Sequence, residues 1–128
     1  MLLKRAQELG YTVTDVGTHD EASTDYPDWA HQVAAKVLAD GGLGILVCGT
    51  GIGVSIAANR HKGIRAALCG DVFSAKATRA HNDANVLCLG ARVVGEGLAR
   101  EIFESFLAAP FEGGRHQRRI DKIESGAA

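Results

Sequence analysis

The sequence predicts an α/β fold in which a parallel sheet is covered by helices on both faces. Two observations carry this prediction: short apolar runs typical of buried strands recur along the chain, and segments with helical spacing of apolar residues separate them. Strands that alternate with helices pair in parallel through right-handed crossovers. The chain of 128 residues is long enough for one hydrophobic core, so we expect a single domain spanning residues 1–128.

The elements follow one another with short connections. A first helix is predicted because Leu2, Leu3, Ala6 and Leu9 share one helical face, and Gly10 is suited to end it. Each predicted strand is a six-residue run rich in Val, Ile or Leu, and each later helix has apolar residues every three or four positions. In chain order these are strand 11–16, helix 28–40, strand 43–48, helix 53–60, strand 64–69, helix 71–82, strand 85–90 and helix 96–109.

The N-terminus departs from the pattern expected of a strand–helix–strand protein. No N-cap residue and no strand precede the first helix, so the chain starts inside it. We therefore expect that the first strand of the fold is missing from this sequence, and that the natural protein begins upstream of Met1.

Composition excludes several classes of protein. Apolar residues make up 46% and charged residues 23% of the chain, and the formal net charge is −1, so nothing indicates a nucleic-acid or membrane-surface binder. No apolar run is long enough to span a bilayer, and the N-terminus does not resemble a signal peptide. Cys48, Cys69 and Cys88 are an odd number without zinc-site spacing, which favours reduced thiols in a cytoplasmic protein.

A glycine-rich loop, "CGTGIG" at 48–53, follows the strand at 43–48. It lacks the Gly-Lys-Ser/Thr ending of a Walker A motif, and Val54 stands where a dinucleotide-binding GxGxxG motif needs its third glycine. Gly49, Gly51 and Gly53 do allow free backbone N–H groups to approach an anion closely. An ordinary tight turn is the alternative, but the accompanying cysteine and threonine favour a functional loop.

Cys48 lies where loop amides and a helix N-terminus would stabilise a thiolate, so its thiol could act as a nucleophile or a general base. A buried structural cysteine is the usual alternative, and we adopt that interpretation for Cys69 and Cys88. Thr50 could donate a hydrogen bond to a developing oxyanion, or could merely satisfy the backbone of the loop.

Two further groups could handle protons and phosphate. His81 and Asn82 end a helix just before a strand, where an imidazole can move a proton and an amide can hold a hydroxyl, although a helix cap is the commoner role. Arg115 and Arg119 are spaced i, i+4 on a short helix, which suits bidentate phosphate contacts and equally suits a solvated basic face. Arg92, after the strand at 85–90, is a third candidate.

Taken together, these motifs resemble the type B ribose-5-phosphate isomerase family, which also contains the galactose-6-phosphate isomerase subunits. The resemblance implies a Rossmann-like α/β/α sandwich and a homodimer, or a tetramer built from it, with active sites at the subunit interface. It also implies metal-free, cofactor-free interconversion of an aldose phosphate and a ketose phosphate through a cis-enediolate. The matching stretches are 15–30, 44–60, 63–69, 79–95 and 111–120.

The resemblance implies roles for particular residues. Cys48 matches the catalytic base, which some relatives replace by Glu, and His81 matches the residue that opens the sugar ring, with Asn82 beside it. Thr50 matches a group that stabilises the enediolate oxygens. The backbone amides that share this role are those of Gly49, Gly51 and Gly53, and the matching phosphate-binding residues are Arg92, Arg115 and Arg119.

One family feature has no match. Relatives begin with a strand that ends in a Gly-x-Asp-His-Ala-Gly pattern bordering the sugar, and in the flavodoxin-like order that strand lies between the second and third strands. We therefore expect a gap in the middle of the sheet. The leading hypothesis is isomerisation of ribose 5-phosphate and ribulose 5-phosphate, although the sequence does not separate pentose from hexose phosphates. The alternative is a non-catalytic module that binds a phosphosugar or a nucleotide.

Overall fold

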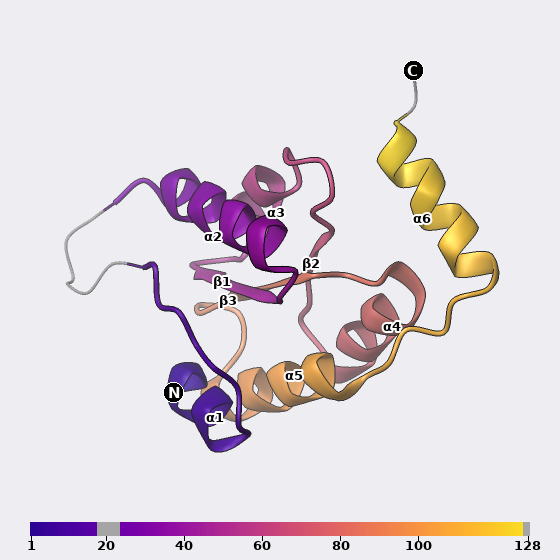
Figure 1. Ribbon diagram of the computed structural model, residues 1–128. Helices are drawn as coiled ribbons and strands as arrows, with labels where there is room; N and C mark the ends of the chain where they lie inside the picture. The colour runs from indigo at the N-terminus through magenta and orange to yellow at the C-terminus, as the bar shows by residue number, and fades with distance from the viewer. Residues whose placement is uncertain (18–23, 127–128) are drawn as a thin grey trace.

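The computed structural model describes residues 1–17 and 24–126, which form a three-stranded parallel sheet with helices on both faces (Figure 1). The strands are β1 (Gly44–Cys48), β2 (Ala66–Leu68) and β3 (Val86–Gly90). The helices of the described residues are α1 (Leu2–Glu8), α2 (Tyr26–Asp40), α3 (Ile52–Ala58), α4 (Val72–Asn82), α5 (Glu96–Ala108) and α6 (Arg115–Ser125). The predicted α/β class is therefore confirmed, and most element bounds agree to within two or three residues.

The central strand β3 explains the layered core. All five of its residues are buried, because successive side chains point to opposite faces of the sheet and each face is covered. Val86 and Cys88 pack with α2 and α3 on one face, whereas Leu87 and Leu89 pack with α1, α4 and α5 on the other. Figure 1 shows α2 and α3 above the sheet and α1, α4 and α5 below it.

The strand order differs from the flavodoxin-like order, which would place the strands β1, β2 and β3 side by side in chain order. The observed order is β1-β3-β2, with Cys48 opposite Gly90 and Leu68 opposite Cys88. A physical reason lies in the sequences of the strands: β3 is apolar throughout and suits the centre, whereas β2 is short and partly exposed and suits an edge.

The strand predicted at 11–16 is wrong for this structure. After α1, these residues run as irregular chain toward the start of α2, and in the described part of the chain they pair with no strand (Figure 1). Their β-branched residues favour extended backbone, but a strand also needs a hydrogen-bonded neighbour. The gap expected in the middle of the sheet does not separate β1, β3 and β2, which form an uninterrupted ladder with β1 at one edge.

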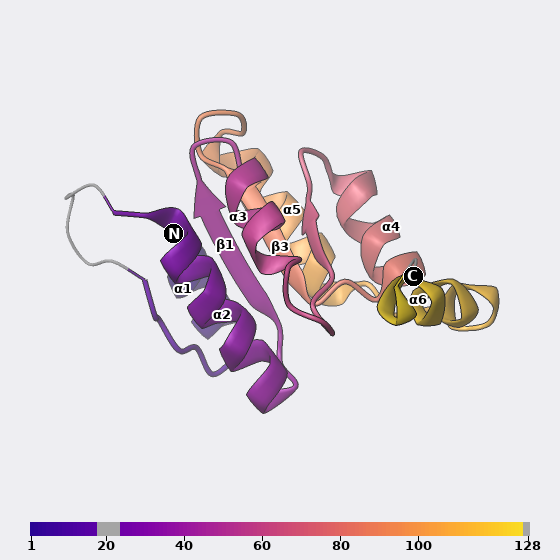
Figure 2. The same cartoon turned by 90° about the horizontal axis from the view of Figure 1, so that it is seen from above.

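Helix α6 stands apart from the sheet. Figures 1 and 2 show it extending away from the body of the molecule beside the end of α4. His116 and Ile120 are its buried residues, and the rest of the helix is largely exposed. Among residues 1–17 and 24–126, none of the helices combines the length and the apolar character needed to cross a bilayer.

Candidate active site

Cys48 is the last residue of β1, and its half-buried thiol faces the glycine loop. The backbone N–H of Gly51 donates a hydrogen bond to Cys48 Sγ over 3.2 Å. Gly51 has φ of +80°, and a Cβ there would lie 2.5 Å from Leu68 Cδ1 and 2.9 Å from the Leu89 carbonyl carbon, so this position needs glycine. The sequence prediction that loop amides face the Cys48 thiol is confirmed at Gly51.

The loop after β3 lies directly against the loop after β1. The backbone N–H of Ala91 donates to Cys48 O (2.8 Å), and that of Arg92 donates to Gly49 O (3.0 Å). A Cβ on Gly90 would lie 2.5 Å from Thr50 O, so the close approach of the two loops depends on that glycine. The side chain of Arg92 lies over Gly49, with its Cδ 3.6 Å from where a Cβ would stand. Arg92 and Cys48 therefore border the same exposed edge of the sheet.

Thr50 and Gly53 complete this first group. Thr50 Oγ1 accepts a hydrogen bond from Ile52 N over 3.2 Å, which leaves the hydroxyl hydrogen available for a ligand. Gly53 faces the ring of Tyr26, whose Cε1 would lie only 2.5 Å from a Cβ at that position. Tyr26 of α2 thus covers the start of α3, a role that its sequence position did not indicate.

A second group of polar side chains surrounds the end of α4. His81 stacks on His116 of α6, with ring centroids 4.4 Å apart and ring planes inclined by 14°. Glu112 Oε1 lies 3.8 Å from His81 Nε2 and 3.6 Å from His116 Nε2. Arg115 and Arg119 belong to the exposed surface of α6. The sequence therefore named four members of this group, with Asn82 beside His81, but missed His116 and Glu112.

His116 is the buried member of the second group. Its side chain is 7% exposed, and within the described residues its Nε2 has no hydrogen-bond partner. Burial, together with the nearby His81 and Arg115, lowers the pKa of His116, so the imidazole is held in its neutral form. The sequence did not indicate His116, because the neighbouring arginines suggested a charged surface and the residue belongs to no spacing pattern.

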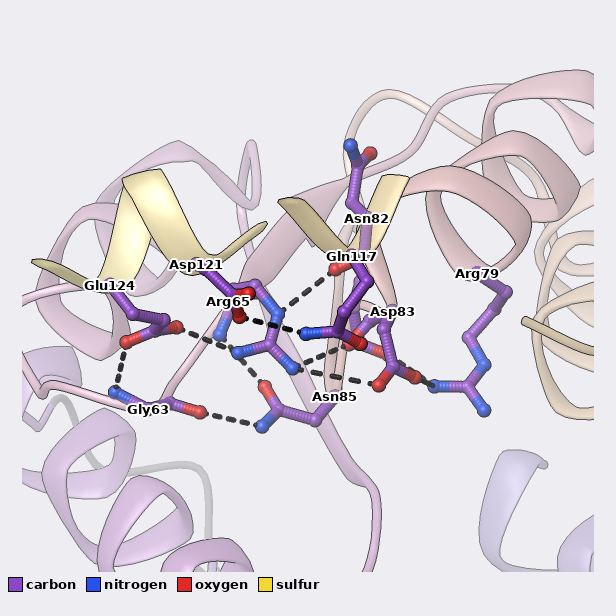
Figure 3. Close-up of polar contacts among 10 residues, drawn as sticks. Gly63, Arg65, Arg79, Asn82, Asp83, Asn85, Gln117, Asp121 and Glu124 are labelled. Carbon is purple, nitrogen blue, oxygen red and sulfur yellow. Dashed lines mark hydrogen bonds and ion pairs between the residues drawn. The ribbon is translucent and has the colours of Figure 1, made fainter. Parts of the chain in front are cut away.

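Asn82 ends α4 beside His81, and its side-chain oxygen accepts a hydrogen bond from Thr78 Oγ1 over 3.0 Å. Figure 3 shows its amide pointing away from the polar network beneath it, while its main-chain carbonyl takes part in that network. The side chain is exposed at this end of the helix and therefore available to a ligand.

The two groups lie at opposite ends of the strands, the first at the carboxyl ends and the second at the amino ends. Helix α4 starts after β2 at the carboxyl ends of the strands and returns to their amino ends before β3 (Figure 2). His81 and Asn82 are the last two residues of α4, so they lie at the opposite ends of the strands from the Cys48 loop. One chain alone therefore does not bring the ten predicted site residues together. The first group contains Cys48, Gly49, Thr50, Gly51, Gly53 and Arg92, and the second contains His81, Asn82, Arg115 and Arg119.

The second group also contains three potential metal ligands. One ligand atom from each of His81, Glu112 and His116 lies within 4.8 Å of the others. Imidazole lone pairs lie in the ring planes, and two nearly parallel rings 4.4 Å apart cannot direct them at one ion unless His81 turns. In the observed arrangement, this trio is a ring stack beside a carboxylate.

Comparison with known proteins identifies the family. Residues 1–123 match the family model described as Ribose/Galactose Isomerase. The chain belongs to this family. The resemblance inferred from the sequence motifs is thereby confirmed.

Relatives in the Ribose/Galactose Isomerase family agree closely in sequence and structure. The chain is 52% identical to ribose-5-phosphate isomerase B of Escherichia coli over 119 residues, covering 91% of this chain and 78% of that protein. It superposes on ribose-5-phosphate isomerase B of Clostridium thermocellum with a TM-score of 0.95 at 48% identity, covering 97% and 84% of the two chains. The Mycoplasma genitalium enzyme, solved with bound ribulose-5-phosphate, gives 0.91 at 48% identity, covering 95% and 82%. The Rossmann-like fold is thus confirmed.

The three thiols are expected to differ sharply in reactivity. Burial raises the pKa of Cys69 to about 11, with a contribution from Asp71, and burial raises the pKa of Cys88 to about 12. Because both values lie above pH 8, both thiols stay protonated there, with roughly one Cys69 in a thousand ionised. Iodoacetamide at pH 8 should therefore add one group to the native chain and three after unfolding, as read by mass spectrometry.

A matched variant makes that labelling test specific. Cys48→Ser should abolish the native adduct and leave two adducts after unfolding. Rapid native labelling of the Cys48→Ser chain would contradict the assignment of Cys69 and Cys88 as buried structural thiols.

Proposed function

We propose that this chain isomerises ribose 5-phosphate and ribulose 5-phosphate. Membership of the Ribose/Galactose Isomerase family supports the reaction class, and the bound ribulose-5-phosphate of the Mycoplasma genitalium relative supports the pentose substrate. The observation that carries the proposal is the position of the half-buried Cys48 Sγ at the end of β1, 3.2 Å from a loop amide. A base next to backbone donors is what proton abstraction beside a carbonyl needs.

The proposed chemistry begins with ring opening. His81 moves the proton between the ring oxygen and the anomeric hydroxyl, with Asn82 holding a sugar hydroxyl. The Cys48 thiolate then removes the proton from C2 of the open aldose, and the electron pair forms the C1–C2 double bond of a cis-enediolate. The hydroxyl proton then moves from O2 to O1, and the same thiol returns its proton to C1. The carbonyl now stands at C2, which is the ketose. No electrons leave the sugar, so the step needs no redox cofactor, and in this proposal hydrogen-bond donors of the glycine loop, not a metal ion, stabilise the enediolate oxygens.

The glycine loop stabilises the enediolate in this proposal. The Thr50 hydroxyl donates to one oxygen, because its Oγ1 already accepts from Ile52 N and its hydrogen remains available. Backbone N–H groups of Gly49 and Gly53 supply further donors, whereas Gly51 N–H is directed at Cys48 Sγ.

We further propose that the active site is shared between two copies of the chain in a homodimer. The two groups of residues lie at opposite ends of the strands of one sheet, so a second copy has to bring its His81 group to the Cys48 loop. Exposed apolar side chains on α3, β2 and the start of α4 offer a surface for that contact. Their exposed fractions are 50% for Ile52, 54% for Ile56, 42% for Leu68 and 78% for Phe73.

In the shared site, the phosphate would be bound from both copies. Arg115 and Arg119 come from one chain and Arg92 from the other, since Arg92 lies over Gly49 in the first group. His116 is a further candidate, because its buried Nε2 has no hydrogen-bond partner within the described residues and the residue lies between Arg115 and Arg119 in the sequence. We place the reaction in the cytoplasm, which three free thiols favour.

The test of this function is direct turnover. Purified protein should convert ribose 5-phosphate to ribulose 5-phosphate with a kcat on the order of 1–1000 s⁻¹, measured as ketose formation. Galactose 6-phosphate serves as the parallel hexose substrate. Calorimetric binding of the phosphosugar without turnover would instead favour a non-catalytic module, and binding of a dinucleotide would contradict both phosphosugar functions.

A further inference from the structure

Helix α6, which carries two of the phosphate-binding candidates, is attached to the rest of the chain at two points. Near its start, His116 stacks on His81. Near its end, Glu124 accepts two hydrogen bonds: Arg65 Nη1 donates to Oε1 over 2.7 Å, and Gly63 N donates to Oε2 over 2.8 Å (Figure 3). Because most of α6 is exposed, these two polar attachments, together with the buried Ile120, determine where the helix lies.

The same Arg65 guanidinium also holds the end of α4. Its Nε donates to the Asn82 carbonyl over 2.9 Å, and its Nη2 donates to the Asp83 carbonyl over 3.0 Å. These carbonyls lie at the helix C-terminus, where no further turn supplies an N–H partner. The fixed fork of a guanidinium can bind three acceptors at once, which a lysine ammonium on a flexible stem cannot match in direction. Figure 3 shows Arg65 between Glu124 and the Asn82–Asp83 turn.

The backbone of Arg65 is itself fixed. Its N–H donates to Asn85 Oδ1 over 2.8 Å, and Asn85 Nδ2 donates to Gly63 O over 2.8 Å. The Arg65 side chain is 18% exposed and Glu124 is 23% exposed, so this ion pair is less screened than a fully solvated one. Arg65 therefore has a rigid base from which to hold both helix ends.

We propose that Arg65, through Glu124, is a positioning residue for the isomerase site. It fixes the end of α4, with His81 and Asn82, relative to α6, with Arg115 and Arg119. The inference rests on the proposed function, because it assigns these four side chains to one substrate. Loosening α6 weakens the phosphate contacts, which bind substrate and transition state alike. It leaves the Cys48 loop, at the opposite ends of the strands, unchanged.

The variants for the test are Glu124→Gln, Arg65→Met and Arg65→Lys. Lys36→Met is the matched control, because it removes an exposed ion pair (Lys36–Asp40, 3.2 Å) from α2, away from both helix ends. For Glu124→Gln we expect KM for ribose 5-phosphate and Ki for inorganic phosphate to rise about fivefold, with kcat within about twofold. Arg65→Met should show a larger rise, and Arg65→Lys an intermediate one.

The proposal is overturned if folded Glu124→Gln has unchanged KM and phosphate Ki, if it loses kcat with KM unchanged, or if Lys36→Met shows the same rise. Should Arg65→Met fail to fold, Glu124→Gln carries the test. Calorimetric binding of inorganic phosphate to the parent and to Glu124→Gln separates this inference from the proposed function: weaker phosphate binding supports positioning even in a protein without turnover, and equal affinity contradicts it.

Discussion

Replacement of Cys48 by alanine is expected to lower kcat for ribose 5-phosphate isomerisation by roughly 100- to 10,000-fold, which is the range that a positioned general base contributes. The residue ends β1, and its Sγ is held by the Gly51 amide beside the donors that would stabilise an enediolate. KM should change little, because most phosphate-binding candidates belong to the second group, at the amino ends of the strands. Initial rates of ribulose 5-phosphate formation over a range of substrate concentrations separate kcat from KM.

Cys69→Ala is the matched control for this prediction. It removes a thiol that directly follows the edge strand β2, where the side chain is buried in the core. That variant should lose stability and keep kcat within about threefold of the parent. If Cys48→Ala keeps a kcat within tenfold of the parent while Cys69→Ala behaves the same way, Cys48 is not the base.

The glycine loop shows how far the sequence could predict the site. Cys48 and its glycines are adjacent in the chain, so a tight turn after a buried strand sufficed to place the thiol against loop amides, and the bond from Gly51 confirms it. The layered core was predictable for the same local reason, since runs such as 85–90 are apolar at every position and need cover on both faces.

Features that depend on contacts distant in the chain could not be predicted. The residues 11–16 have a strand-like composition, but pairing is decided by neighbours, and the described chain offers them none. The order β1-β3-β2 likewise depends on which strand is best buried at the centre. Arg65 gave no sequence signal because its partners, Asn82 and Glu124, lie 17 and 59 residues away.

The ten predicted site residues illustrate the limit most clearly. Their residue types and order indicated one site, yet within one chain Cys48 lies at the carboxyl ends of the strands and His81 at the amino ends. The separation follows from the crossover helix α4, which necessarily ends at the edge opposite to the carboxyl ends of the strands. We therefore propose that a second chain completes the site, and this is the central claim of the proposed function.

Mixing two inactive variants tests this claim most directly. Cys48→Ala lacks the base and His81→Asn lacks the ring-opening residue, so each homodimer should be nearly inactive. In a mixed dimer, one of the two sites combines an intact Cys48 loop with an intact His81 from the other chain. Random reassembly of equal amounts should therefore restore about a quarter of the parent activity, because half of the dimers are mixed and each has one intact site.

The double variant Cys48→Ala/His81→Asn supplies the control. Mixed dimers of this chain with the parent contain no intact site, so equal mixing should lower the activity to about half of that of the parent in the mixture before exchange. Native mass spectrometry measures the fraction of mixed dimers in both preparations. Recovery of about a quarter of the parent activity from the two single variants is the result expected of a shared site. Activity no greater than the sum of the two single variants, in a preparation where mixed dimers are abundant, would contradict it.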